Sequence, residues 1–326
     1  MKAVLMVNLG TPQAPTASAV GAYLIEFLSD PLVVDLPRWL WIPLLRLVIV
    51  PLRRYRSAEA YRKVWMNEGS PLLVLSERLA RGVQGRLGGE AVVALGMRYG
   101  QPSLRSALEG LREADTDELV VLPMYPQFSR TTTQTVIEGV SEALRELDWF
   151  PEVQTIAQYH DRGEWVTAVA DSIREYRLTH GQADKLLFSL HGIPQRYADA
   201  GDPYALQCHQ SVAAITRELG LEREQWLLSF QSRVGREPWL KPYTDFVLRD
   251  WAANGVRTVQ VVCPGFAVDC LETLEEIAMR NEELFRKHGG ERLQYIPALN
   301  DSAAHVALMA RLVREAGNTA GVQSPR

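Results

Sequence analysis

Short apolar runs alternate with longer amphipathic stretches along the whole chain. The runs have the length and the Val, Leu and Ile content of buried parallel strands, and they lie at 3–9, 91–97, 118–122, 153–158, 185–190, 226–230, 258–263 and 292–296. Between them, apolar positions recur at helical spacing, for example over 163–178, 203–219, 241–253, 269–288 and 302–316. This alternation predicts an α/β protein with parallel sheets.

A weak internal repeat decides between one eight-stranded barrel and two smaller sheets. LGTP at 9–12 follows the first predicted strand as HGIP at 191–194 follows the fifth. YPQF at 125–128 follows the third as CPGF at 263–266 follows the seventh. Two similar Rossmann-like lobes, each a parallel four-stranded sheet flanked by helices, account for these matches better than a barrel does.

We expect the lobes at 1–180 and 181–326, with an active-site cleft between them. The two proline-containing turns lie 114 residues apart in the first half and 70 residues apart in the second, so the first lobe carries 44 additional residues. An insertion at about 31–70 would supply them.

The insertion contains an apolar segment from Trp39 to Val50 that is interrupted by prolines and arginines. It is therefore no candidate for a transmembrane helix, and no other stretch of the chain is long and apolar enough. One interpretation is an apolar lip on the inner membrane surface, with Trp39 and Trp41 at the interface. The other is a helical hairpin folded over the core or the cleft.

Composition narrows the class of protein. The 326 residues are 47% hydrophobic and 23% charged, with a net charge of −4 and no basic block, so we expect no nucleic-acid partner. Three cysteines without a C-x-x-C pair and an N-terminus without a signal peptide favour a cytoplasmic protein. The chain has none of the common nucleotide-binding, serine-hydrolase or zinc-protease motifs.

His191 is the first candidate for chemistry. It ends an apolar run and precedes Gly192 and Pro194, which stop the strand. Ligands in open α/β sheets bind at the carboxyl ends of the strands, where such an imidazole would lie. The alternative is a histidine that only caps the strand by bonding a backbone carbonyl.

An acidic cluster follows the seventh predicted strand. Asp269, Glu272 and Glu276 have helical spacing and would share one face of a helix that begins near Asp269. Such a ridge opposite His191 could hold a divalent cation or move protons. The alternative is a capping box, with Asp269 as N-cap and Glu272 bonded back to a backbone amide.

Seven segments, spread in order over the whole chain, resemble the ferrochelatase family in its proteobacterial form. They are VNLGTP (7–12), GSP (69–71), GMRY (96–99), LPMYPQFS (122–129), LFSLHGIP (187–194), FQSRVGREPWL (230–240) and CPGFAVDCLETLEE (263–276). The resemblance implies a two-lobed chelatase fold and a lyase of haem biosynthesis. Its substrates would be protoporphyrin IX and Fe²⁺, and two protons would be released.

The resemblance also implies roles for the candidate residues. His191 and Glu272 would handle metal and protons on one side of the porphyrin, and Glu276 would continue the proton path toward solvent. Glu275 would point elsewhere, to the surface. Leu9, Arg98, Tyr99, Trp239 and Phe266 would bind the porphyrin: Arg98 would face a propionate, and Leu9 would lie on the opposite face of the ring, where it cannot coordinate iron.

Two departures from other family members affect the cofactor prediction. Some members hold an iron–sulfur cluster, but here Arg130 follows Ser129 and no cysteine follows Cys270, so we expect no cluster and no cofactor beyond the substrate Fe²⁺. Cys270 replaces a histidine of some relatives, as either a metal-contacting thiol or a half-buried cysteine. The alternative functions are a chelatase for another tetrapyrrole or metal (coproporphyrin III with iron, or a cobalt chelatase) and a non-catalytic tetrapyrrole carrier.

Overall fold

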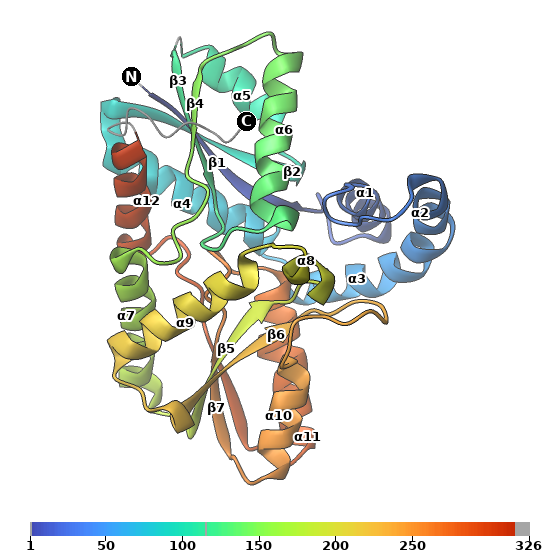
Figure 1. The fold of residues 1–326 in the computed structure, drawn as a ribbon, viewed down its shortest axis with the longest axis vertical. Helices are drawn as coiled ribbons and strands as arrows, with labels where there is room; N and C mark the ends of the chain where they lie inside the picture. Colours follow the sequence, from blue (N-terminus) through green and yellow to red (C-terminus); the bar gives the residue numbers. More distant parts are fainter. Residues whose placement is uncertain (1, 115, 317–326) are drawn as a thin grey trace.

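The computed structural model describes residues 2–114 and 116–316, and in these ranges eight parallel strands form two sheets. The first sheet has the order β2-β1-β3-β4, with β1 at Lys2–Thr11, β2 at Ala91–Gly100, β3 at Glu118–Pro123 and β4 at Glu152–Thr155. The second has the order β6-β5-β7-β8, with β5 at Lys185–His191, β6 at Trp226–Gln231, β7 at Thr258–Val262 and β8 at Arg292–Ile296. The identical order confirms two similar lobes rather than a barrel (Figure 1).

The strands form where the apolar runs predict them because helices cover both faces of each sheet. In β1, every residue from Ala3 to Val7 is fully buried. The edge strand β4 differs: Glu152 and Val153 are exposed, and the strand ends at Thr155, earlier than predicted. An edge strand lacks a neighbour on one side, so its sequence signal is weaker.

Corresponding helices connect the strands of the two lobes. In the first lobe these are α4 (Pro71–Leu87), α5 (Leu104–Arg112), a π-helix (Arg130–Gln134) and α6 (Thr135–Glu146). In the second they are α8 (Gln195–Asp199), α9 (Tyr204–Leu219), α10 (Thr244–Ala253), a π-helix (Glu272–Asn281) and α11 (Glu282–Lys287). Single 3₁₀ turns at Gly88–Glu90 and Arg223–Gln225 lead into β2 and β6.

The last helix of each half packs on the other lobe. α7 (Gly163–His180) follows β4 but packs against α9 and β8 of the second lobe. α12 (Ala303–Ala316) follows β8 but packs against α4 and β3 of the first, as Figure 1 shows. β4 and β5 lie on either side of residue 180 in the sequence, while α7 and α12 each pack on the other lobe.

A helical arm stands between β1 and α4, where the second lobe has the five-residue helix α8. The arm consists of α1 (Ala17–Leu28), α2 (Arg38–Leu44), a π-helix (Leu45–Ile49) and α3 (Val50–Val64). It begins before the predicted start of the insertion at about residue 31, and it projects sideways from the two lobes (Figure 1). Among the described residues, no helix has the length and apolar character needed to cross a membrane.

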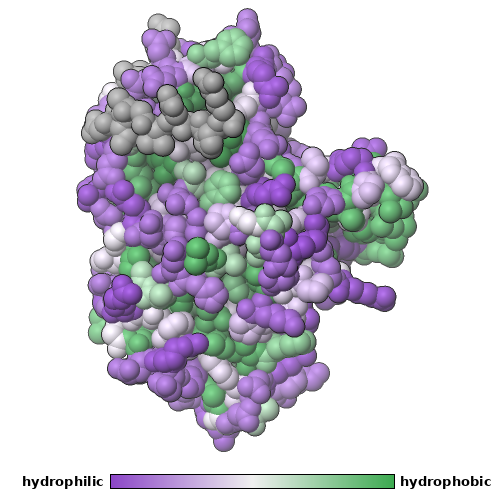
Figure 2. Space-filling view, in the orientation of Figure 1, coloured by the Kyte–Doolittle hydropathy of each residue, from purple (hydrophilic) through white to green (hydrophobic). Residues whose placement is uncertain are grey.

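The tip of the arm exposes large apolar side chains. Trp39 is 80% exposed, Leu47 76% and Leu52 74%. Figure 2 shows hydrophobic residues gathered along this projection. The prediction that Trp41 also lies at an interface is wrong, because Trp41 is buried and its indole Nε1 donates to the Leu28 carbonyl oxygen at 2.7 Å.

Candidate active site

His191 is the last residue of β5 and pairs in register with Gln231 of β6. Its half-buried imidazole has Nδ1 2.7 Å from the Gly192 carbonyl oxygen. A carbonyl only accepts, so Nδ1 carries the proton and Nε2 keeps its lone pair in the neutral ring. The side chain does bond a backbone carbonyl, as the capping alternative predicts, and the same bond leaves Nε2 with a lone pair for a proton or a metal ion.

Gly192 lets the Trp239 ring approach the end of β5. A Cβ at Gly192 would lie 3.2 Å from Trp239 Cε3 and 3.0 Å from the Gln231 carbonyl oxygen. That oxygen accepts the Gly192 N–H at 2.9 Å, and Trp239 is bridged to Pro194. The half-buried indole of Trp239 therefore lies against Gly192, the residue after His191.

The acidic segment after β7 forms a π-helix rather than the predicted α-helix. Its buried residues include Thr273 and Ile277, which are four positions apart, a spacing that an α-helix would also give. The predicted N-cap and capping box are wrong, because the helix starts at Glu272 and the Asp269 N–H donates to the Asn300 side chain instead.

Asp269 does not belong to the predicted acidic ridge. Its buried carboxylate accepts hydrogen bonds from the Tyr295 hydroxyl at 2.6 Å, the Thr273 hydroxyl at 2.9 Å and the Asn300 side-chain amide at 2.8 Å. These contacts anchor the loop after β8 to the start of the π-helix. The ridge is thus reduced to Glu272 and Glu276.

The Glu276 carboxylate is held by Ser232, the first residue after β6. Its two oxygens accept the Ser232 N–H at 2.9 Å and the Ser232 hydroxyl at 2.5 Å. Burial raises the pKa of Glu276, although these bonds and the nearby His191 oppose the rise. A carboxyl with a raised pKa can hold a proton closer to neutral pH than an exposed one.

Glu272 lies among groups from both lobes. Its carbonyl oxygen accepts the Gln231 side-chain amide at 2.9 Å, and its side chain contacts the Cys270 thiol. Burial and then the charge of Glu272 raise the pKa of Cys270, so the thiol stays protonated; it is buried rather than half-buried. Tyr61 of α3 has a raised pKa for the same two reasons, which places the helical arm next to Glu272.

Glu275 is buried, and its prediction as a surface residue is wrong. Its carboxylate pairs with Arg280 at 2.7 Å and with Lys63 of α3 at 3.6 Å. The predicted direction assumed α-helical spacing and solvent on that side of the helix, whereas α3 covers it. An ion pair thus links the arm to the helix that carries Glu272 and Glu276.

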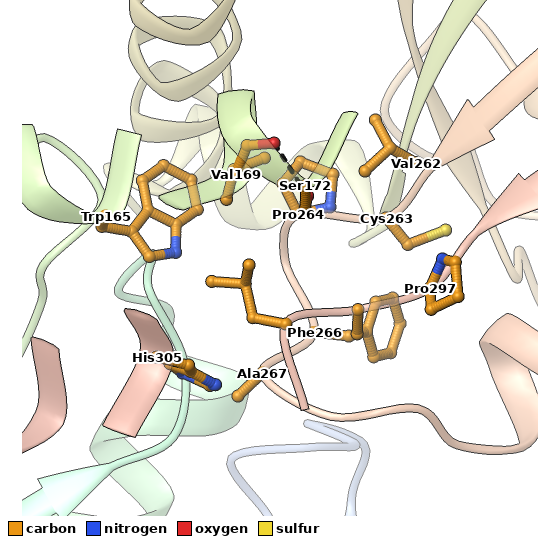
Figure 3. Close-up of a pocket in the computed structure, with 12 residues that line it drawn as sticks. Trp165, Val169, Ser172, Val262, Cys263, Pro264, Phe266, Ala267, Pro297 and His305 are labelled. Atoms are coloured by element: carbon orange, nitrogen blue, oxygen red, sulfur yellow. Dashed lines mark hydrogen bonds between the residues drawn. The ribbon is translucent and has the colours of Figure 1, made fainter. Parts of the chain in front are cut away.

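Phe266 contacts the His191 ring and also lines a small cavity. Its ring meets the His191 ring edge to face, with centroids 6.5 Å apart. The cavity has a volume of about 10 Å³, room for about one water molecule, and lies at the seam of α7, α12 and the loops after β7 and β8. Figure 3 shows Phe266, Trp165 and His305 around it.

The other predicted porphyrin residues belong to the first lobe. Arg98 pairs with Asp30 at 2.6 Å, so its charge already has a partner. Tyr99 is only 1% exposed and donates its hydroxyl to Asp30 at 2.8 Å, which gives it a packing role in this structure. Leu9 is half-buried near the carboxyl end of β1.

Sequence reasoning missed Tyr61, Lys63 and Ser232. Ser232 could have been found, because it follows a buried strand at the same sheet edge as His191. Tyr61 and Lys63 carry no such signal, since only the tertiary packing of α3 brings them to the site. Among the described residues, no three His, Cys, Asp or Glu side chains form a ready-made metal site.

Solved chelatases share this architecture. SirB from Bacillus subtilis with Fe³⁺ aligns with a TM-score of 0.58 at 10% identity, over 97% of this chain and 96% of that one. CbiX, described as the terminal enzyme of sirohaem biosynthesis in denitrifying bacteria, aligns with a TM-score of 0.51 at 12% identity, over 97% and 99%. The fold is that of the chelatases.

The ferrochelatase family model matches residues 1–317, and the chain belongs to that family. The ferrochelatase of Edwardsiella ictaluri is 51% identical over 310 residues, covering 95% of this chain and 96% of the relative. That of Nitrosococcus oceani is 48% identical over 315 residues, covering 96% and 86%. The chain is thus a metal chelatase that inserts iron into a porphyrin in haem biosynthesis, which confirms the predicted family and enzyme class.

Proposed function

We propose that His191, Glu272 and Glu276 carry out the metallation of protoporphyrin IX in this enzyme. The observation that supports this most is the hydrogen bond of His191 Nδ1 to a carbonyl, which leaves Nε2 as an acceptor in a ring whose charge is felt by the Glu276 carboxylate. In this proposal Trp239 and Phe266 border the porphyrin on the His191 side, and Leu9 lies on the opposite face.

The chemistry needs a base and a route for protons. Metallation removes two pyrrole N–H protons as Fe²⁺ takes their place. His191 Nε2 accepts a proton from the ring, and an imidazole does so near neutral pH. Glu272 takes protons onward, and Glu276, whose pKa burial raises, accepts them at the next turn of the helix.

The iron is a substrate that must arrive and then leave for the ring. An imidazole and a carboxylate suit ferrous iron, and His191 with Glu272 offers one of each. Two ligands are too few to hold the iron in a stable coordination shell, so this site favours passing the iron to the porphyrin over keeping it. In this proposal a porphyrin propionate shares the Arg98 guanidinium with Asp30.

The test is anaerobic incubation of the full chain with protoporphyrin IX and Fe²⁺, with zinc as the backup metal, followed in the visible spectrum. We expect the free-base bands to convert to the metalloporphyrin spectrum. His191→Ala and Glu272→Ala should each still bind porphyrin but metallate it roughly 10²–10⁴-fold more slowly, the usual contribution of a general acid or base. The matched controls are the exposed His209→Ala and Glu283→Ala, which should keep parental rates.

The same assay separates the alternative functions. Faster conversion of coproporphyrin III, or of a porphyrin with cobalt than with iron, would assign a different substrate. Binding without conversion of any porphyrin would indicate a carrier. Normal turnover by either active-site variant would remove that residue from the proposal.

We further propose that the helical arm contacts the inner membrane surface through the segment from Trp39 to Val50. Trp39 and Leu47 are exposed within this segment and Leu52 just after it, and Arg38 and Arg46 immediately precede Trp39 and Leu47, where they can meet anionic headgroups. The full chain should therefore sediment with anionic liposomes. Trp39→Ser with Leu47→Ser should abolish sedimentation and leave zinc insertion in detergent unchanged, whereas unchanged sedimentation would contradict the contact.

The absence of an iron–sulfur cluster and a cytoplasmic location stay predictions. Arg130 occupies the internal position where a cluster ligand would stand, and Cys208, Cys263 and Cys270 are buried without disulfide bonds. Anaerobically purified protein should show no cluster absorption in the visible range and no bound iron beyond substrate.

A further inference from the structure

We propose that Gln231 and Ser232 are positioning residues that together hold the two carboxylate-bearing residues, Glu272 and Glu276, in place beside His191. The inference rests on the proposed function of those glutamates. The supporting observation is that this adjacent pair, the last residue of β6 and the one after it, bonds both Glu272 and Glu276 and also the residue after His191.

Gln231, the last residue of β6, connects β5 to the π-helix. Its backbone carbonyl accepts the Gly192 N–H at 2.9 Å, next to His191. Its side-chain oxygen accepts the Ser189 hydroxyl at 2.6 Å, and its side-chain amide donates to the Glu272 carbonyl oxygen at 2.9 Å. The side chain is 3% exposed, so water offers little competition for these bonds. Gln231 therefore fixes the distance between His191 and the first turn of the π-helix.

Ser232 holds the Glu276 carboxylate with two donors, its N–H and its hydroxyl. The backbone of Ser232 is left-handed, with a φ of 65°. Non-glycine residues rarely adopt this conformation, and they do so where the surroundings enforce it, often at functional sites. A glycine would be less strained here but would lack the hydroxyl. The strained serine is therefore consistent with a need for that second donor.

The two contacts suit a division of tasks. Gln231 holds the backbone of Glu272, so its side chain stays free to take part in chemistry. Ser232 holds the side chain of Glu276 itself and keeps it from turning to the arginine that pairs with Glu275. The spacing between the two carboxylates is thereby set by adjacent residues of one rigid strand end.

The test compares two substitutions that remove the same hydroxyl and affect stability in opposite directions. Ser232→Gly relieves the left-handed backbone, and Ser232→Ala retains the strain. We expect zinc-insertion kcat to fall roughly 10- to 100-fold in both, the effect of losing a hydrogen bond to a charged group, with an unchanged KM for porphyrin. The melting temperature should be at or above the parental value for glycine and below it for alanine. Ser141→Ala, which removes an exposed hydroxyl in α6, is the matched control.

A structural role would give a different result. If kcat followed the melting temperature, so that only the alanine variant lost activity, or if Ser232→Gly kept the parental kcat, the inference would be overturned for Ser232. Gln231→Met should likewise lower kcat without raising the KM for porphyrin, and parental kcat in that variant would overturn the role of Gln231.

Double variants separate this inference from the proposed function. Ser232→Gly should add little to Glu276→Gln, and Gln231→Met little to Glu272→Gln, because each acts through its glutamate. Fully additive losses would overturn the positioning roles. Parental turnover in the Glu276→Gln single variant would instead refute the proposed function of that glutamate. This measurement does not depend on the double variants.

Discussion

Asp269→Ala tests whether this carboxylate stabilises the fold or takes part in the chemistry. The carboxylate is 5% exposed and accepts hydrogen bonds from Thr273, Tyr295 and Asn300. Alanine leaves these three donors without their acceptor. The Thr273 hydroxyl can turn to the Cys270 carbonyl oxygen, 3.2 Å away, and the Ala298 N–H loses only a long bond of 3.4 Å. The Tyr295 hydroxyl and the Asn300 amide, which make short bonds, remain unpaired.

The cost follows mainly from the two donors with short bonds. A buried donor left unpaired costs about 1–3 kcal/mol, so Asp269→Ala should lose about 2–6 kcal/mol of unfolding free energy. For a chain of this size, about 2 °C of melting temperature is lost per kcal/mol, which predicts a fall of about 8 °C at the middle of that range. Asp245→Ala is the matched control, because Asp245 makes only partly exposed ion pairs with Arg233 and Arg249 and should cost about 1 kcal/mol or less.

The assay is urea unfolding and thermal melting of both variants, with zinc insertion measured well below the melting temperature. We expect Asp269→Ala to be clearly destabilised and to lose less activity per folded molecule than Glu272→Ala. A parental melting temperature combined with complete loss of metallation would refute the reasoning. It would place Asp269 in the proton path that the sequence pattern first predicted.

Three further predictions concern the surroundings of the site. Burial lowers the pKa of His305 from 6.5 to about 4, so as the pH falls the unfolded chain takes up a proton at this residue before the folded chain does. The free energy of unfolding should therefore be about 2 kcal/mol lower at pH 5 than above pH 6.5. Urea unfolding of His305→Gln should lack this loss. Lys63→Met should lower zinc-insertion kcat several-fold and cost about 1 kcal/mol or less of unfolding free energy. If the kcat losses of Lys63→Met and Glu275→Gln were fully additive in the double variant, the two residues would not act through their ion pair. Gly192→Ala should cost about 1–3 kcal/mol in thermal melts and slow metallation, whereas Gly163→Ala, with no atom within 4 Å of the new Cβ, should do neither; equal effects of the two would refute the steric argument.

The sheets and the histidine were accessible from sequence because their signals are local. A buried parallel strand needs a continuous apolar run, and a residue placed directly after one, such as His191, must lie at the sheet edge where sites form. The repeated turns then gave two lobes in place of a barrel. The family motifs identified the enzyme class, since several segments in fixed order are far more specific than any one of them.

The details of the acidic helix were not accessible in the same way. An α-helix and a π-helix place apolar residues at nearly the same spacing, so the pattern around Ile277 does not distinguish them. Asp269 and Glu275 were assigned to the wrong surroundings because their partners, Tyr295 and Lys63, come from distant segments. Long-range packing of this kind leaves no mark in a local window of sequence.

The crossing of α7 and α12 has a consequence for how the chain reaches its fold. The first sheet is synthesised early, yet α12, which packs on α4 beside it, comes from residues 303–316. Until those residues leave the ribosome, the first half would carry an uncovered apolar face, and α7 would lack its packing partner until α9 is synthesised. Neither half is therefore a self-sufficient folding unit. Separately expressed halves should be aggregation-prone alone and recover structure only when they are produced together.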